Sequence, residues 1–172
     1  MTCRDSAPAR AHPLGIAAIL ALTLGLGAAA DVAAEFETRL ASTDTSGVPA
    51  PHSAEAWLGA EGIARTVAAG DEHAVTLKVA GLVPEGLYTF WWVTPGILRT
   101  AMGPGGGAPS NNSRADAGGA AEVTIRVPAD NDYAIVVVAY HADDALHGES
   151  PGQMGAVTFQ HLVGPWPGPA ND

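Results

Sequence analysis

The stretch that decides the fold is Val75–Val93, which reads VTLKVAGLVPEGLYTFWWV. Its first part alternates apolar and polar residues, which is the period-two pattern of a half-buried strand. Its last part, Leu87–Val93, is rich in the aromatic and β-branched residues that favour strands. Between them lies Gly81–Gly86, where Pro84 fixes φ and Gly86 is free to take positive φ, as a turn requires. The stretch therefore predicts two adjacent strands joined by a short turn.

The chain on either side of this stretch shows the same kind of pattern. Ala121–Val127 alternates again, and Tyr133–Tyr140 is a continuous apolar run typical of a strand covered on both faces. Ala156–Val163 predicts the last strand, and Trp57–Leu58 and Gly62–Val67 predict two short ones. We therefore expect an all-β fold: an antiparallel, immunoglobulin-like β-sandwich of about seven or eight strands, with no significant helix after residue 35.

Two segments show no clear period. Residues 35–52 are predicted to be a flexible lead-in, and the sandwich domain is expected at 53–165, with a tail at 166–172. Residues 101–119 form a long Gly- and Pro-rich connection, of the kind that is usually functional or disordered. The predicted core includes Val75, Leu77, Val79, Val123, Ile125, Ile135, Val137 and Phe159.

Trp91 and Trp92 occupy adjacent positions of the predicted strand 87–93, so their side chains must point to opposite faces. One of them is expected in the core. The other is expected either beneath a loop or exposed on a binding surface.

A signal peptide is predicted at residues 1–34. Arginines lead into the apolar run Leu14–Gly27, and small residues follow, which gives a charged start, a short apolar centre and an A-x-A exit. Cleavage is expected after Ala30 or Ala34. A membrane anchor is the alternative, but spanning a bilayer takes about 20 apolar residues, and acidic residues follow this shorter run. The mature protein is therefore expected to be secreted or periplasmic, and not embedded in a membrane.

The composition excludes several classes of function. The one cysteine, Cys3, lies in the predicted signal peptide, so the mature chain would have no disulfide, no thiolate ligand and no cysteine nucleophile. The formal net charge of the chain is −10 at pH 7. Because such a charge repels phosphate backbones, nucleic acid is not expected as a partner. A protein or a small ligand remains compatible with the sequence.

Two short motifs have the spacing of a known site but lack its chemistry. Gly148–Gly152 matches the G-x-S-x-G nucleophile elbow, yet Pro151 follows the serine and has no N–H to offer an oxyanion. Gly103–Ala108 is similar to a dinucleotide-binding loop, but Pro109 follows where a helix is needed. We therefore predict neither catalytic residues nor an organic cofactor, and an enzyme is the least favoured class.

The loop His141–Gly155 carries the densest set of metal-ligand side chains in the mature chain. Imidazole, carboxylate and thioether groups together suit copper or zinc. The residues of this candidate metal site are His141, Asp143, Asp144, His147, Met154 and, on the following strand, His161. Their spacing matches no metal signature, and an acidic, solvated loop is the alternative interpretation. The predicted function is an exported, non-catalytic binding or structural module without a cofactor, with copper or zinc binding by these residues as the second hypothesis.

The Val75–Val93 stretch, with its G-L-x-P-x-G turn and its strand ending Y-T-x-W-W, resembles a pattern of uncharacterised exported β-sandwich proteins of bacteria and archaea. Val136–His141, followed by His147 and Gly148, is similar to the penultimate strand and loop of the same group. The likeness spans roughly residues 60–163. It implies the sandwich fold and export, and it implies no activity.

Overall fold

The computed structural model describes residues 35–96 and 100–168, and the predicted signal peptide lies outside the described residues. The described chain is all-β and antiparallel, as predicted, with one short helix, α1 (Ala54–Leu58). Its strands are β1 (Glu35–Ser42), β2 (Glu61–Ala69), β3 (Glu72–Ala80), β4 (Leu87–Thr94), β5 (Ala101–Pro104), β6 (Asn112–Arg114), β7 (Ala121–Pro128), β8 (Ile135–His141) and β9 (Thr158–Pro165).

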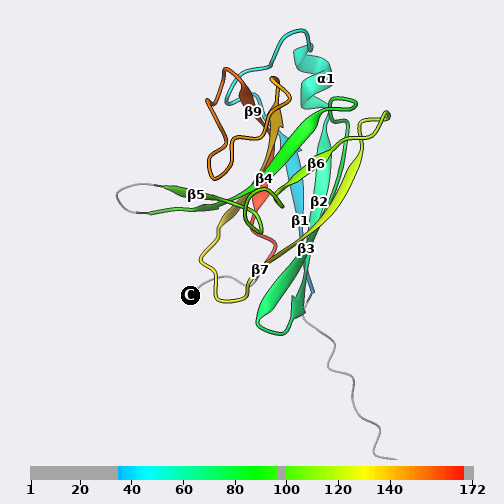
Figure 1. The fold of residues 1–172 in the computed structure, drawn as a ribbon. Coiled ribbons are helices and arrows are strands. Elements are labelled where there is room, and N and C mark those ends of the chain that lie inside the picture. Colours follow the sequence, from blue (N-terminus) through cyan, green and yellow to red (C-terminus); the bar gives the residue numbers. More distant parts are fainter. Residues whose placement is uncertain (1–34, 97–99, 169–172) are drawn as a thin grey trace, which may run out of the picture. The chain divides into compact units, whose positions relative to one another are not determined.

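The strands form a sheet in the order β5-β4-β8-β9-β1-β2-β3-β7, and β6 also pairs with β4 (Figure 1). The sheet folds back on itself at β1. Residues Glu35–Ala41 pair along their length with β2, whereas only Ala41 and Ser42 pair with β9. This short junction lets the sheet fold into two layers, β4-β8-β9 and β1-β2-β3-β7, with apolar side chains between them.

The main core lies between these layers. Alternation along β3 buries Val75, Leu77 and Val79 and leaves Lys78 exposed, as the sequence predicts. Burying an aliphatic side chain of this size stabilises the fold by about 1.5–3 kcal/mol. Of the residues predicted for the core, Val123 and Ile135 are only partly buried, and the other six are buried.

Strand β4 is buried on both faces, which accounts for its continuous apolar sequence. Trp92 points into the main core, and Trp91 points to the opposite face, where it packs with Val93, Val137 and Ala139. The predicted opposite orientation of the two tryptophans is therefore confirmed. Because both side chains are only 1% exposed, Trp91 lies beneath covering chain and does not form an open binding surface.

Three segments differ from the prediction. Residues 35–52, predicted to be flexible, contain β1, so the folded domain begins well before residue 53. Trp57–Leu58, predicted as a strand, belongs to α1, whose first turn is capped by the Ser53 hydroxyl accepting from the Ala56 N–H at 3.2 Å. Residues 101–119, predicted as an irregular connection, contain the short strands β5 and β6, which bring the described strands to nine.

Candidate functional site

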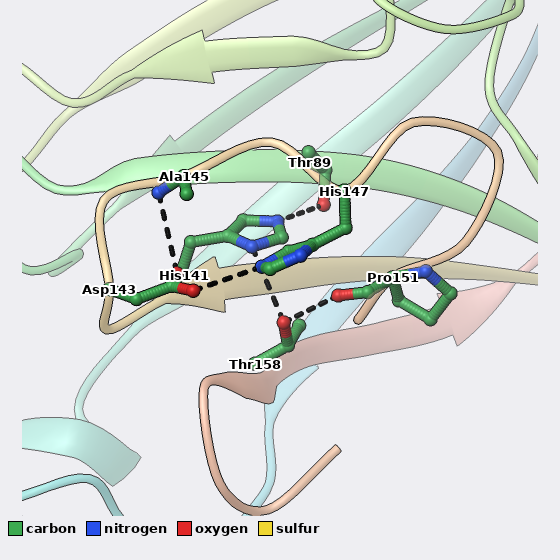
Figure 2. A network of polar contacts seen from close by, with 7 residues as sticks. All are labelled: Thr89, His141, Asp143, Ala145, His147, Pro151 and Thr158. Atoms are coloured by element: carbon green, nitrogen blue, oxygen red, sulfur yellow. Dashed lines mark hydrogen bonds and ion pairs between the residues drawn. The ribbon is translucent and has the colours of Figure 1, made fainter. Parts of the chain in front are cut away.

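The loop between β8 and β9 gathers three of the predicted metal ligands: His141, Asp143 and His147. One nitrogen or oxygen from each lies within 4.8 Å of the other two. Figure 2 shows the two imidazole rings lying one over the other, with the Asp143 carboxylate beside them. The ring centroids are 5.5 Å apart, with 28° between the ring planes.

His141, at the end of β8, is 2% exposed and uses both ring nitrogens. Its Nε2 lies 2.7 Å from the hydroxyl of Thr89 on β4, and its Nδ1 lies 3.3 Å from the hydroxyl of Thr158 on β9. Both partners are themselves fixed. The Trp91 indole N–H donates to Thr89 at 2.7 Å, and the Thr158 hydroxyl donates to the Pro151 carbonyl at 2.5 Å. His141 is therefore held by three strands and by its own loop.

These contacts assign the tautomer of His141. A threonine hydroxyl has a single hydrogen, and that of Thr158 is given to the Pro151 carbonyl, which can only accept. Thr158 must then accept from His141, so the proton sits on Nδ1, and Nε2 accepts from the Thr89 hydroxyl. Burial lowers the pKa of His141, the positive charge that His147 can carry lowers it further, and Asp143 acts in the opposite direction. The neutral imidazole is the form that this network stabilises.

The His147 side chain is 27% exposed, but its ring nitrogen Nε2 is buried. Its Nε2 is 3.1 Å from Oδ2 of Asp143, but the alignment is not that of a hydrogen bond, and this buried nitrogen has no hydrogen-bond partner among the described residues. Gly152 lies close to the same ring. Its φ is +84°, and a Cβ there would come within 2.7 Å of the imidazole. A buried nitrogen without a hydrogen-bond partner is the kind of group that a bound cation would satisfy.

The other three predicted ligands lie outside this group. Asp144, at a φ of +54°, forms an ion pair with Arg114 at 2.7 Å, and Met154 is 40% exposed. His161 belongs to the inner face of β9. Thr158 shares the face of His141, and a residue three positions further along a strand points to the opposite side.

His161 is part of a separate buried network that ties α1 to the sheet. The Val83 N–H donates to the Tyr88 hydroxyl at 2.9 Å, and this hydroxyl lies 3.0 Å from Nδ1 of His161. Nε2 of His161 lies 2.9 Å from the carbonyl of Trp57, whose indole stacks on the imidazole at 3.6 Å between centroids. Because a carbonyl only accepts, the proton of His161 sits on Nε2 and the Tyr88 hydroxyl donates to Nδ1. No free lone pair is left for a metal.

The Gly-rich connection reaches the loop that carries the candidate site. The two segments line one small pocket together with Trp91. The connection contributes Ala108, Pro109 and Asn111, and the β8–β9 loop contributes Leu146–Gly148. Asn111 is anchored there, because its backbone carbonyl accepts from the Phe90 N–H at 2.8 Å. The Gly148–Gly152 motif lies in the same loop. Ser150 is exposed, and the described residues after it, 151–168, contain no helix.

Sequence reasoning missed the two threonines that orient His141. Thr89 and Thr158 look like ordinary strand residues, and only the pairing of β4 and β9 with β8 brings them to the imidazole. Comparison with known proteins adds no further assignment: no protein-family model matches the chain, and no curated protein sequence is similar to it.

Proposed function

We propose that the protein is an exported, non-catalytic binding module whose ligand is a divalent transition-metal ion, with zinc and copper(II) as the best fits. The observation that carries this proposal is the convergence of His141, Asp143 and His147 within 4.8 Å, with the buried Nε2 of His147 left without a hydrogen bond. Two imidazoles and one carboxylate are a ligand set that suits both ions, and water would complete the coordination.

His141 can join such a site through Nδ1. Its contact with Thr158, at 3.3 Å, is longer than the 2.7 Å contact with Thr89 and is the weaker one to give up. The neutral ring carries one proton, so binding through Nδ1 requires this proton to pass by way of solvent from Nδ1 to Nε2. Nε2 then donates to Thr89, whose hydroxyl turns its own hydrogen away from the ring. The oxygen of Thr89 has two lone pairs and can accept from both Trp91 and His141. Metal binding is therefore coupled to a change of the His141 tautomer, and Thr89 orients the ring through Nε2 in both states.

The test is a titration of zinc and copper(II) into metal-free protein prepared without a histidine tag. We expect saturable binding of one ion per chain, with affinity lowered at least about tenfold by Asp143→Asn or His147→Gln, the size of change that losing a ligand produces. Asp144→Asn is the matched control, because Asp144 has the same carboxylate, one residue away, engaged with Arg114. It should bind as the wild type does.

A purely structural role for this loop makes the opposite prediction. In that case the metal does not bind with a defined stoichiometry, or it binds equally well to Asp143→Asn and Asp144→Asn, and the proposal fails. Loss of folding is checked by circular dichroism. Asp143→Asn keeps the size of the side chain and alters an exposed residue, so the variant is expected to fold.

The finer architecture and the location belong to the same proposal. The neighbours β2-β3-β7 in one layer and β4-β8-β9 in the other follow the A-B-E and C-F-G orders of an immunoglobulin-like sandwich, and this order supports that assignment. Export follows from the predicted signal peptide alone. Among the described residues, no helix is both long and apolar enough to cross a membrane.

A further inference from the structure

The outer face of the β1-β2-β3-β7 layer carries a groove that the metal site does not involve. Its volume is about 670 Å³, within the usual range for small-ligand sites. One side of the groove is formed by four residues that lie opposite one another in register, one on each strand: Arg39, Ile63, Lys78 and Glu122. Arg114 belongs to the lining contributed by β6 and the chain that follows. The lining includes the short side chains of Ala80, which lies directly opposite Glu61, and Ala120, beside the longer side chains of Arg39, Lys78 and Glu122.

The groove is balanced in charge, although the chain as a whole is strongly acidic. Three cationic and three anionic side chains line it: Arg39, Lys78, Arg114, Glu61, Asp116 and Glu122. The described chain has five basic residues: Arg39, Arg65, Lys78, Arg114 and Arg126. Three of them, Arg39, Lys78 and Arg114, line the groove. Such a concentration of positive charge contrasts with a net charge of −10 for the whole chain.

Four of these six groups already have partners. Lys78 pairs with Glu122 at 3.3 Å, and Arg114 pairs with Asp144 at 2.7 Å. Asp116 accepts from two backbone N–H groups of its own turn, at 2.8 and 2.9 Å. Within the described part of the chain, Arg39 and Glu61 have no ion-pair or side-chain hydrogen-bond partner. The groove thus holds one guanidinium and one carboxylate that are free to bind.

These two groups are placed as neighbours. Arg39 pairs in register with Ile63, and Glu61 lies two residues from Ile63 on the same face of β2. Arg39 and Glu61 are therefore diagonal neighbours on adjacent strands, about 7–8 Å apart. Ile63, which is 38% exposed, lies directly opposite Arg39 and forms a triangle with the two charged residues. A positive group, an apolar contact and a negative group are therefore presented at its three corners.

We infer that this groove binds a small zwitterion with a free carboxylate and a free ammonium group, namely an amino acid or a short peptide. The carboxylate would form a bidentate pair with the Arg39 guanidinium, the ammonium group would pair with Glu61, and the aliphatic part would pack on Ile63. A purely anionic ligand fits less well, because the net charge of the chain repels it at long range. A zwitterion has no net charge to be repelled and satisfies both free groups.

The test is calorimetric titration of metal-free protein, kept in chelator, with leucine and with leucyl-leucine. Binding by leucine alone identifies an amino-acid site, and binding by leucyl-leucine alone identifies a peptide site. For the probe that binds, the N-acetylated and C-amidated forms should each bind at least about tenfold more weakly, since each lacks one charged end. The chelator keeps this result independent of the proposed metal site.

The variants separate this pairing from general surface charge. Arg39→Gln and Glu61→Gln should each weaken binding at least about tenfold, and the swap Arg39→Glu/Glu61→Arg should restore much of it, because the ligand can bind reversed. Arg126→Gln is the matched control: it is exposed on the same layer, lies outside the groove and pairs with Glu72. The inference is overturned if neither probe binds saturably, or if Arg39→Gln binds as tightly as Arg126→Gln.

Discussion

Acid should destabilise this protein through one buried imidazole, that of His161. Its pKa is lowered from 6.5 to about 4, chiefly by burial. The hydrogen bond to the Trp57 carbonyl opposes this shift, and the positive charge that His52 can carry adds to it. In the unfolded chain the imidazole regains its ordinary pKa. Between pH 6.5 and pH 4 the unfolded state therefore binds the extra proton. The stabilising contribution is fully present above pH 6.5 and is lost as the pH falls through this window.

The size of the effect follows from the shift. A shift of one pKa unit corresponds to about 1.4 kcal/mol, so the whole window is worth about 3 kcal/mol, of which about 2 kcal/mol is lost between pH 8 and pH 5. This is a large fraction of the stability of a small domain, which is typically about 5–15 kcal/mol. The network explains the direction. A protonated ring would set its Nδ1–H against the Tyr88 hydroxyl, which would have to turn its own hydrogen elsewhere.

The assay is urea unfolding, followed by tryptophan fluorescence, of the wild type and His161→Gln at pH 8 and pH 5. Other titrating groups contribute nearly equally to both proteins, so the difference between them isolates His161. We expect the wild type to lose about 2 kcal/mol more than the variant between the two pH values. His52→Gln is the control, because it also removes a histidine but leaves the buried imidazole in place. It should retain the acid-linked loss.

One result would refute this reasoning. If the stability difference between the wild type and His161→Gln is the same at pH 8 and pH 5, His161 does not gain a proton on unfolding. The network of Tyr88, His161 and Trp57 would then not be the acid-sensitive element of the fold.

Three further predictions concern the core, the loop and the N-terminus. Leu77→Ala should lower the free energy of unfolding by about 2–5 kcal/mol in urea titrations, because Leu77 is 0% exposed and its removal leaves a cavity between the two layers. Gly152→Ala should displace the His147 ring and weaken zinc or copper binding with the fold intact, because a Cβ at a φ of +84° clashes with that imidazole. Wild-type metal affinity in this variant would count against the proposed geometry. N-terminal sequencing of the exported protein should begin after Ala30 or Ala34, and both cleavage sites leave β1 intact because it begins at Glu35; a product that still begins at Met1 would contradict export with cleavage.

Local patterns in the sequence determined most of the strands. Period-two alternation is a property of the backbone itself, so β3 and β7 could be predicted without knowing their partners. The composition of β4 and β8 likewise indicated strands covered on both faces. Strand β1 alternates as regularly in EFETRL, but Thr38 occupies the middle of its three inward positions, so the apolar pattern is too short to predict a strand. Its strand character depends on pairing with β2, which lies about 25 residues along the chain.

Only the tertiary structure decided which histidines meet. By sequence, His141, His147 and His161 are equally plausible members of one site. The pairing of β8 with β9 sets Thr158 opposite His141 and turns His161 to the inner face, against Tyr88 and Trp57. The groove of Arg39 and Glu61 likewise exists only because β1 and β2 pair in one register. Register is set by long-range packing of the buried face, and a one-residue slip would exchange the two faces of a strand. That information is shared between distant segments, and no single stretch of sequence contains it.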